Sequence, residues 1–452
     1  MNTGLVALLI ILAIIVISVV TKRCAEALIA GSLIAGLFLW GPRDFLPQWS
    51  GMLQAKIAEN VWIMLVCGLF GSLIALLQES KGSYGFSKAV SKICKNERKT
   101  LLMSFLMGIV IFVDDYLNVL SIGVCMKNVY DRRRLPRESL AYMLDATGAP
   151  VCVILPFSTW AAFYASLFFE QESVKTLGFA SGMQAYIHAI PFFFYPIFTL
   201  IIVFLFALGV FPRLGLMKKA YARVAETGKV YSDASRKYNH EEYQGFEQDG
   251  NIWDFVIPMV ILVGTTIAAS DLLMAVILAL IVCFVLYIPR KVIPLDEFFN
   301  LMVKGFADLL PILFMLMISF VLVGICDEME MTAFVIGVAQ PLLRGTVFPA
   351  VTFVLVSALC FATGSLWGMS AIVAPFIFPL GAAIGANPVL IMAAIVSGGA
   401  FGSHACFYTD ATLLSSQAAG IDNLEHALSQ LPYVIIAAVM SIVGFLICGA
   451  VI

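Results

Sequence analysis

Charged residues are scarce in this sequence. Only 12% of its 452 residues are Asp, Glu, Lys or Arg, and 61% are hydrophobic. Roughly a quarter of the residues of an ordinary soluble protein are charged, so this composition excludes a soluble domain. It indicates a polytopic membrane protein, with the lipid bilayer as a partner. The formal net charge of -2 also excludes a generally basic nucleic-acid-binding protein.

Cysteine pairs and enzyme signatures are absent as well. The ten cysteines are scattered singly, without a CxxC pair, and this pattern predicts neither a disulfide framework nor a metal cage. The motifs HExxH, GxSxG and GxxxxGKS/T do not occur. We therefore expect no enzymatic activity and no cofactor other than a coupling ion.

Apolar runs fill most of the chain. About 20 helical residues cross ~30 Å of hydrocarbon, and the candidate runs are residues 4–20, 24–40, 60–78, 139–168, 185–211, 253–270, 272–289, 305–325, 388–416 and 431–452. The first run has no basic segment before it and no cleavage site after it, so we expect it to be retained as a helix. Two further runs, 100–126 and 346–385, do not fit a single crossing.

The run 100–126 is basic at both ends. Lysine and arginine are concentrated in residues 81–99 and again in 127–137. Basic flanks mark the cytoplasmic side of a membrane, so both ends of this run face one compartment and the run must enter and return. At ~1.5 Å per residue, half of it reaches the bilayer midplane, which places the turn at Asp114, Asp115 and Asn118. A single tilted helix with both acids on a packed face is the alternative.

The order of apolar runs recurs about 250 positions later in the chain, and FVDDYLNVLS at 112 resembles FATGSLWGMS at 361. Each copy would hold five transmembrane helices plus one re-entrant hairpin, and the odd number of crossings turns the second copy upside down. Such inverted repeats are typical of secondary transporters. We predict an all-α polytopic membrane protein with a first inverted repeat over 1–211, a cytoplasmic linker over 212–251, a second inverted repeat over 252–452, and both termini external.

Glycine and proline interrupt the fifth helix of each repeat, and we expect a broken helix in both. The interruptions are Gly148, Pro150 and Pro156 in the first repeat and Gly398, Gly399 and Gly402 in the second. Broken helices expose backbone carbonyls that line cavities in transporters, and hydroxyl groups nearby add oxygen donors of the kind that hard cations prefer. The hydroxyl residues that we predict to bind substrate or ion are Ser158, Thr159, Thr363, Ser365, Ser403, Thr409 and Thr412.

Four aspartates fall in candidate membrane-buried positions, namely Asp114, Asp115, Asp145 and Asp410. An ionised acid at the bilayer centre costs ~2.5–3.5 kcal/mol on insertion scales, and a bound cation or proton would offset this cost. Asp114, Asp115 and Asp410 are the candidate sodium ligands. Capping of a helix N-terminus is the alternative role, and Asp145 fits either role. One cap needs only one carboxylate, so capping does not account for both members of the adjacent pair.

Other side chains near these acids admit two roles each. His404 lies between Gly402 and Asp410 and could titrate near neutral pH, whereas a buried hydrogen-bonding role is the alternative. Trp160 and Trp367 flank the two polar centres. They fit either the wall of an organic substrate site or interior packing.

Three segments, FVDDYLNVLSIG, LAYMLDATGAPVCVILPFSTWAAF and FGSHACFYTDATLLSS, carry a resemblance over nearly the whole chain. They resemble the NhaC-type sodium/proton antiporters and their amino-acid-transporting relatives in the ion transporter superfamily. The resemblance implies an elevator or rocking carrier with inverted repeats, coupling to sodium or protons, and a homodimer. The third segment departs from the family pattern, approximately FGDNLSPISDTT, because Ser403 replaces an acid and His404 replaces an asparagine. This difference favours an organic substrate.

The expected function is that of a cation-coupled secondary transporter of the NhaC type, which exchanges or co-transports sodium and/or protons by alternating access. The alternative is a sodium- or proton-coupled carrier of an organic solute such as an amino acid or a carboxylate. A channel would need a continuous polar pore, which paired broken helices do not favour. We expect an integral protein of a bacterial inner (plasma) membrane, with a small inorganic cation as partner and a small organic solute in the alternative.

Overall fold

A computed structural model describes the chain over residues 3–21, 23–82, 85–86, 89, 92–239, 250–269, 271–308, 310–331, 334, 344–363, 366–407 and 409–452. The regular elements of these residues are all helices, which confirms the all-α class. The helices up to residue 211 are α1 (Thr3–Thr21), α2 (Cys24–Glu59), α3 (Val61–Glu79), α5 (Glu97–Val110), α6 (Asp115–Arg132), α7 (Arg137–Thr147), α8 (Ala149–Ile154), α9 (Thr159–Phe169), α10 (Glu172–Lys175), α11 (Gly182–Ala189), η1 (Ile190–Phe192) and α12 (Phe194–Ala207).

Two short helices lie between the predicted repeats, α13 (Gly215–Thr227) and η2 (Ala234–Asn239). The remaining helices are α14 (Trp253–Ala269), α15 (Leu272–Tyr287), α16 (Leu295–Asp308), α17 (Leu310–Glu328), α19 (Phe348–Thr363), α20 (Leu366–Ala383), α21 (Pro388–Ala405), α22 (Asp410–Ala419) and α23 (Asn423–Val451).

Length and hydropathy mark α20, α21 and α23 as helices able to cross a membrane by themselves. Three bent helix pairs also pass the same test when each pair is taken as one span. One pair joins α7 and α8 to α9 with a bend of 46°, and another joins α11 and η1 to α12 with a bend of 51°. The first bend contains Pro156, where the sequence predicts a broken helix.

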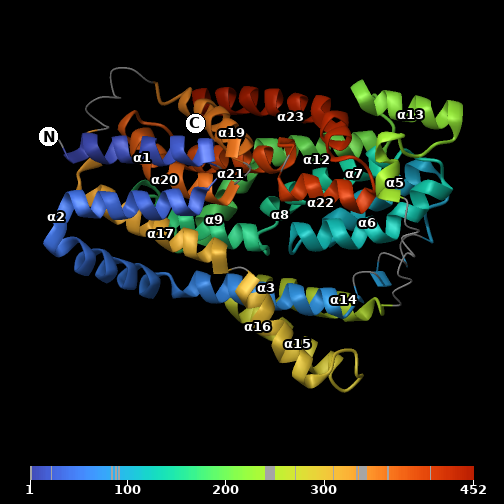
Figure 1. Cartoon of the computed structure of the whole chain (residues 1–452), viewed down its shortest axis with the longest axis horizontal. Coiled ribbons are helices and arrows are strands. Elements are labelled where there is room, and N and C mark those ends of the chain that lie inside the picture. Colours follow the sequence, from blue (N-terminus) through green and yellow to red (C-terminus); the bar gives the residue numbers. More distant parts are fainter. Residues whose placement is uncertain are drawn as a thin grey trace.

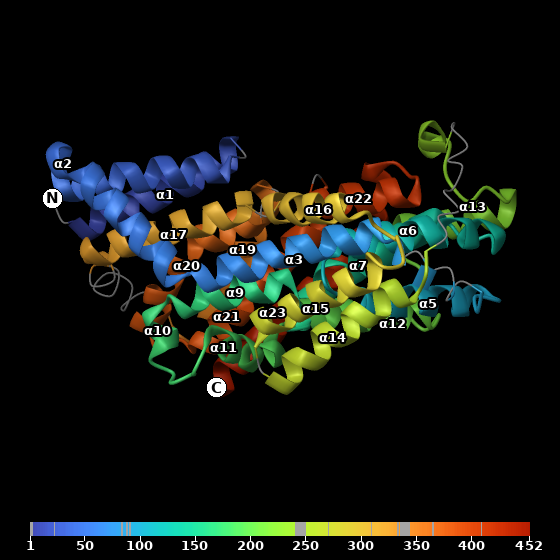
Figure 2. The same cartoon turned by 90° about the horizontal axis from the view of Figure 1, so that it is seen from below.

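The helices pack into two groups. The frame group consists of α2, α3 and α14 to α17, and the hairpin group consists of α5 to α12 and α19 to α23; most helix packing lies within a group. Figure 1 shows α3, α14, α15 and α16 together on one side of the molecule, with α12, α21 and α23 on the other, and Figure 2 looks onto the first set from below. The groups meet where α3 packs on α9 and α17 packs on α20.

Helices α5 and α6 form an antiparallel hairpin. The Ser104 and Tyr130 hydroxyls lie 3.1 Å apart across it, and near its open end the Arg133 Nε donates to the Cys94 carbonyl at 3.0 Å. The helix breaks at residues 111–114, and Asp114 restarts it by accepting the Leu117 N–H at 3.0 Å. The predicted turn therefore occurs at the paired aspartates. Its insertion from the cytoplasmic side stays a prediction.

Helix starts in the two halves keep one spacing. Each helix of the first set begins 251 positions before its counterpart: α5 and α19 at Glu97 and Phe348, α7 and α21 at Arg137 and Pro388, and α9 and α22 at Thr159 and Asp410. A shared hydrogen bond keeps the same spacing, because Ser158 Oγ donates to the Cys152 carbonyl and Thr409 Oγ1 donates to the Ser403 carbonyl. The predicted repeat of about 250 residues therefore has a counterpart in helix order.

The predicted position of the second break is wrong. Helix α21 runs without interruption through Gly398, Gly399 and Gly402, and the chain leaves the helix only after Ala405. These glycines instead let α19 approach closely. A Cβ atom at Gly398 would lie 2.7 Å from Val356 Cβ, and one at Gly402 would overlap Cys360. Glycine in an apolar span therefore marks close helix packing here, which is common between membrane helices.

Within the predicted linker 212–251, α13 docks on the hairpin group. Arg223 on α13 binds the Glu138 carboxylate of α7 through both terminal nitrogens, at 2.8 and 2.9 Å. Arg213, just before α13, donates to Glu97 at the start of α5 at 3.2 Å. These contacts fix the linker helix against the open end of the α5–α6 hairpin. The domain boundaries at 211 and 251 stay predictions.

Candidate functional site

A cavity of about 260 Å³ lies between the two helix groups. The hairpin group contributes the tip of α6 and the first turns of α9 and α20. The frame group contributes α3, α16 and α17. The residues whose chemistry matters most are Gln78, Asp114, Asp115, Tyr116, Thr159, Trp160, Phe163, Asp308 and Trp367.

Asp114 and Asp115 give the cavity its charge. Each is only 7% exposed, although both line the cavity. Asp114 accepts the Leu117 N–H and so caps α6, while Asp115 accepts from Trp160 Nε1 at 3.4 Å. The capping role expected for one of these acids is therefore present at Asp114, and the role of Asp115 as a sodium ligand stays a prediction. Two adjacent and nearly buried carboxylates favour a cation.

Aromatic rings form one wall of the cavity. The Trp160 and Trp367 ring centroids lie 4.8 Å apart, and Phe163 packs edge-on against Trp367 at 4.6 Å. The two tryptophans come from α9 and α20, so this contact joins helices from the two halves of the chain. Their packing role and their lining role are both present.

Asn118 holds the hairpin closed from inside. Its Nδ2 donates to the carbonyls of Gly108 and Ile111 at 2.7 and 2.8 Å, the last of which has left the α5 helix. Its Oδ1 is buried without a hydrogen-bond partner. Asn118 is not among the residues that line the cavity. Asn118 therefore ties α6 to the end of α5 and fixes the position of the aspartates at the tip of the hairpin.

The hydroxyl residues at the breaks lie mostly inside the packing. Ser158 caps α9 by accepting the Ala161 N–H at 3.1 Å, and Thr159 is the one next to it that lines the cavity. Thr409 donates to the Ser403 carbonyl at 2.8 Å and lies 3.0 Å from the Thr412 hydroxyl. These groups satisfy carbonyls freed by the breaks.

Asp145 and His404 belong to a second polar cluster, away from the cavity lining. His426 Nε2 and Gln430 Nε2 lie 3.0 and 2.8 Å from Asp145 Oδ2. Gln430 also donates to the His404 carbonyl at 2.7 Å, and His404 Nδ1 lies 2.8 Å from the Tyr195 hydroxyl. The hydrogen-bonding role expected for a buried histidine is therefore present at His404.

Three predicted site residues cannot be compared with the geometry. Ser365 lies outside the described residues, and the side chains of Thr363 and Asp410 do as well. Thr363 ends α19 and Asp410 begins α22. Their roles stay predictions.

The sequence reasoning missed the contribution of the frame group. Asp308, the last residue of α16, lines the cavity opposite the hairpin tip, with Gln78 of α3 beside it in the lining. Asp308 lies inside the apolar run 305–325, and an acid in such a run is a signal of the same kind as Asp114. Among the described residues that line the cavity there is no lysine, arginine or histidine. A cavity with this lining suits a positively charged ligand.

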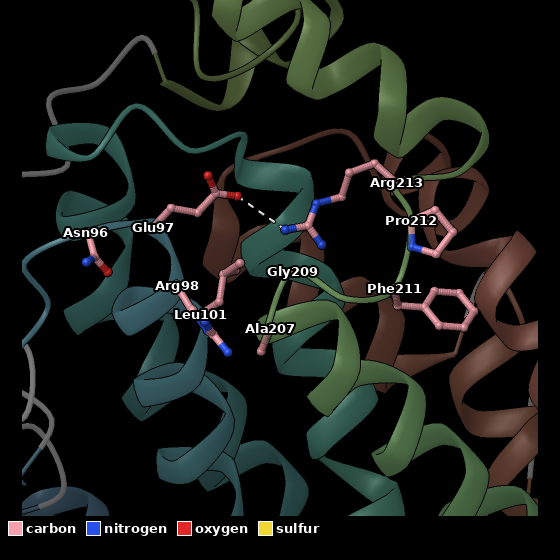
Figure 3. A pocket seen from close by; sticks show the side chains of 9 residues that line it. All are labelled: Asn96, Glu97, Arg98, Leu101, Ala207, Gly209, Phe211, Pro212 and Arg213. Atoms are coloured by element: carbon pink, nitrogen blue, oxygen red, sulfur yellow. Dashed lines mark hydrogen bonds and ion pairs between the residues drawn. The ribbon is translucent and has the colours of Figure 1, made fainter.

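A second hollow, of about 540 Å³, lies at the open end of the α5–α6 hairpin (Figure 3). The Arg213 guanidinium crosses it to reach Glu97 at 3.2 Å. Arg213 also packs on the Phe206 ring at 3.7 Å and donates to the Phe206 carbonyl at 2.8 Å. Its charge is thus used in fixing the linker, so this hollow is not the candidate site.

Comparison with known proteins agrees with this arrangement. The chain is 25% identical to an uncharacterized protein of Haemophilus influenzae, over 96% of this chain and 89% of the relative. A shorter match, 30% identical over 23% of each chain, is to the malate-2H(+)/Na(+)-lactate antiporter of Bacillus subtilis.

Two solved structures share the fold. MtrF of Neisseria gonorrhoeae, described within a class of antimetabolite efflux pumps, superposes with a TM-score of 0.62 at 14% identity, covering 90% of this chain and 84% of MtrF. The YdaH transporter of Alcanivorax borkumensis gives 0.59 at 11% identity, covering 100% and 98%. The model of the Na+/H+ antiporter family matches residues 151–450. The chain is therefore an integral membrane transporter, not an enzyme, and it belongs to the Na+/H+ antiporter family.

Proposed function

We propose that this protein is a secondary transporter that carries a sodium ion at the tip of the α5–α6 hairpin, exchanged for or moved together with protons. The observation that carries the proposal is the position of Asp114 and Asp115 in a cavity between the two helix groups. A bound sodium ion offsets the cost of two nearly buried carboxylates. The carboxylates are therefore more stable when a cation is bound between the helix groups, which is what a coupling site requires.

The two halves of the chain would form inverted repeats around this cavity. The equal spacing of helix starts supports this, and so does the cavity lining. Asp115 and Tyr116 follow the turn of the first hairpin, and Leu366 and Trp367 occupy the positions 251 residues later in the second; all four line the cavity. Equivalent positions of the two hairpins thus meet at one site, as inverted repeats do at the substrate sites of transporters.

Alternating access follows from the two-sided lining. One wall belongs to the hairpin group and the other to α3, α16 and α17 of the frame group. A displacement of one group against the other changes the side on which the cavity opens, while the sodium ligands on α6 move as one body. We propose a bacterial inner membrane as the setting, with the open end of the α5–α6 hairpin on the cytoplasmic side.

A second candidate function is sodium-coupled transport of an organic solute. The cavity volume of about 260 Å³ far exceeds the ~30 Å³ that one water molecule occupies, and it approaches the ~300 Å³ at the lower end of small-molecule pockets. Trp160 and Trp367 supply aromatic surface, and three carboxylates supply charge. These features favour a small solute that carries an amine.

Flux in proteoliposomes tests the proposed function. A sodium gradient should drive uptake of radioactive sodium in the wild type, and Asp115→Asn should abolish it because the amide cannot offset the cation charge. Asp296→Asn, an exposed acid in the first turn of α16, is the matched control and should transport normally. Full activity of Asp115→Asn would overturn the assignment of the sodium site.

A pH-sensitive dye inside the vesicles separates the two candidate functions. Sodium/proton exchange predicts that a sodium gradient alone changes the internal pH. A coupled carrier of an organic solute predicts no pH change, and no net sodium uptake, until the solute is added. A screen of amines, amino acids and carboxylates under the same gradient then identifies the substrate class.

A further inference from the structure

A buried polar cluster joins four helices of the hairpin group. Asp145 lies on α7, His404 on α21, and His426 and Gln430 on α23, and each is 0–1% exposed. Tyr195 of α12, fully buried, completes the cluster through the hydroxyl that meets His404. None of these residues lines the cavity at the hairpin tip, so the cluster is separate from the proposed sodium site.

Several atoms of this cluster are buried without a hydrogen-bond partner. They are Asp145 Oδ1, His404 Nε2, His426 Nδ1 and Gln430 Oε1. Buried polar atoms are almost always hydrogen-bonded in native proteins, and four exceptions within one connected set are unusual. Three of the four atoms belong to groups that can gain or lose a proton. The cluster therefore has unused capacity for a proton, not only for structural hydrogen bonds.

The charge of the Asp145–His426 pair depends on one proton. With that proton the pair is a carboxylate beside an imidazolium, or a neutral acid beside a neutral imidazole, and its net charge is zero. Without it the pair carries a full negative charge at 0–1% exposure. Such a charge costs several kcal/mol in a low-dielectric interior, so the surroundings favour the state that holds the proton.

Among the described residues, no salt bridge joins Asp145 to a lysine or an arginine. The described titratable groups around the Asp145–His426 pair are His404 within the cluster and nearby tyrosines. Tyr142 stacks on Tyr433 at 4.8 Å and on His404 at 6.4 Å, and Tyr195 bonds to His404. Glu425, next to His426 in sequence, accepts instead from the hydroxyls of Ser232 and Ser235 in the linker, at 2.7 and 2.6 Å. The proton is therefore the charge that can neutralise Asp145.

We propose that Asp145 and His426, held by Gln430, form a proton-binding site that is distinct from the sodium site at the hairpin tip. The two sites communicate through one turn of α7. Asp145 lies three residues before Gly148, where a Cβ atom would be 3.5 Å from the Cβ of Asp115 and 3.8 Å from the Asp145 carbonyl. Asp115 on α6 and the Asp145 backbone on α7 thus approach the same residue, Gly148, and α6 packs on α7 within the hairpin group. The coupling of the two ions rests on the proposed function, whereas proton binding by the pair does not.

Nitrogen-15 NMR of histidine-labelled protein in lipid nanodiscs tests proton binding directly. The chain has four histidines, so His426→Gln assigns one resonance by its disappearance, and the introduced amide keeps a donor to Asp145. The pair should lose its proton when the sample is changed from acidic to alkaline, and the loss should appear either in the His426 ring signals or in the signal of the Asp145 carboxyl. His188→Gln, an exposed histidine on α11, is the control for assignment. Carbon-13 labelling of aspartate follows the Asp145 carboxyl in the same way. If neither the His426 ring nor the Asp145 carboxyl changes its protonation state between acidic and alkaline samples, the proposal is overturned.

Flux measurements then test the coupling. In proteoliposomes with sodium on both sides, His426→Gln should retain exchange of radioactive sodium but lose the pH change that accompanies net sodium movement. Size-exclusion profiles and thermal unfolding identify any variant that fails to fold, and Asp145→Asn gives an independent second variant. Wild-type proton movement in both variants would overturn the coupling role. Asp115→Asn tests the sodium site independently, because sodium exchange should be lost in that variant and retained in His426→Gln.

Discussion

The packing of α19 against α21 can be tested by one added methyl group. In Gly398→Ala the new Cβ would lie 2.7 Å from Val356 Cβ and 3.1 Å from the backbone nitrogen of Ser357. Carbon atoms pack best at about 3.5–4.0 Å, so the two helices must separate by roughly 1 Å or strain their side chains. Overpacking of this kind costs ~1–3 kcal/mol. The higher helix propensity of alanine relative to glycine stabilises the variant by about 1 kcal/mol.

Gly264→Ala is the matched control for this prediction. Gly264 is also a helical glycine, on α14, and a Cβ there would have nothing within 4 Å. This variant should gain the propensity of alanine without the clash. We therefore expect Gly398→Ala to be less stable than Gly264→Ala by ~1–3 kcal/mol.

Thermal unfolding of the two purified variants, followed by tryptophan fluorescence, measures the difference. An unfolding entropy of about 2.1 cal/mol/K per residue over 452 residues corresponds to ~1 kcal/mol per degree. Gly398→Ala should therefore unfold roughly 1–3 °C below Gly264→Ala. Equal unfolding temperatures would refute the close packing of α19 on α21. The glycines would then be a flexible break, as their pattern in the sequence first indicates.

Two further substitutions probe the linker and the hairpin. Burial raises the pKa of the Glu138 carboxyl above the ordinary 4.5, and the hydrogen bond and charge of Arg223 oppose the shift. A raised folded pKa means that stability falls as pH rises through that range. Arg223→Met should therefore cost about 3 kcal/mol near neutral pH and less near pH 5, as measured by thermal unfolding. Lys229→Met, which removes an exposed ion pair with Asp233, should change little at either pH, and an equal loss in both variants would contradict this reasoning. Asn118→Ala leaves the Gly108 and Ile111 carbonyls without their donor and should cost about 2–4 kcal/mol. The control Asn60→Ala removes partly buried hydrogen bonds at the end of α2 and should cost about 1 kcal/mol. A larger loss of stability in Asn60→Ala than in Asn118→Ala would contradict the role of Asn118 in holding the hairpin together.

The hairpin tip and the first break could be predicted because their signals are local. Asp114 and Asp115 stand out in an apolar run with basic flanks, and Pro156 cannot continue a helix. The free-energy cost of a buried carboxylate and the missing N–H of a proline can both be seen in the sequence, without knowledge of which residues lie nearby in the fold. The repeat of helix order could also be predicted, because the order of the apolar runs recurs about 250 positions later in the sequence.

The remaining features depend on partners that are distant in the sequence. The pair Asp145 and His426 is separated by 281 positions, and Asp308 reaches the cavity only because α16 packs beside α3. Gly398 illustrates the same limit, because a glycine serves either a break or a close contact, and only the position of α19 decides between them. No local pattern encodes that position.

Sodium-dependent thermal unfolding of Asp115→Asn is the most direct test of the proposed sodium site. Ligand at 100 times its dissociation constant stabilises the folded state by about 2.7 kcal/mol, so replacing choline chloride with sodium chloride should raise the unfolding temperature of the wild type and of Asp296→Asn by several degrees. Asp115→Asn should show no such rise. An equal rise in all three proteins, or no rise in the wild type, would contradict sodium binding at the hairpin tip.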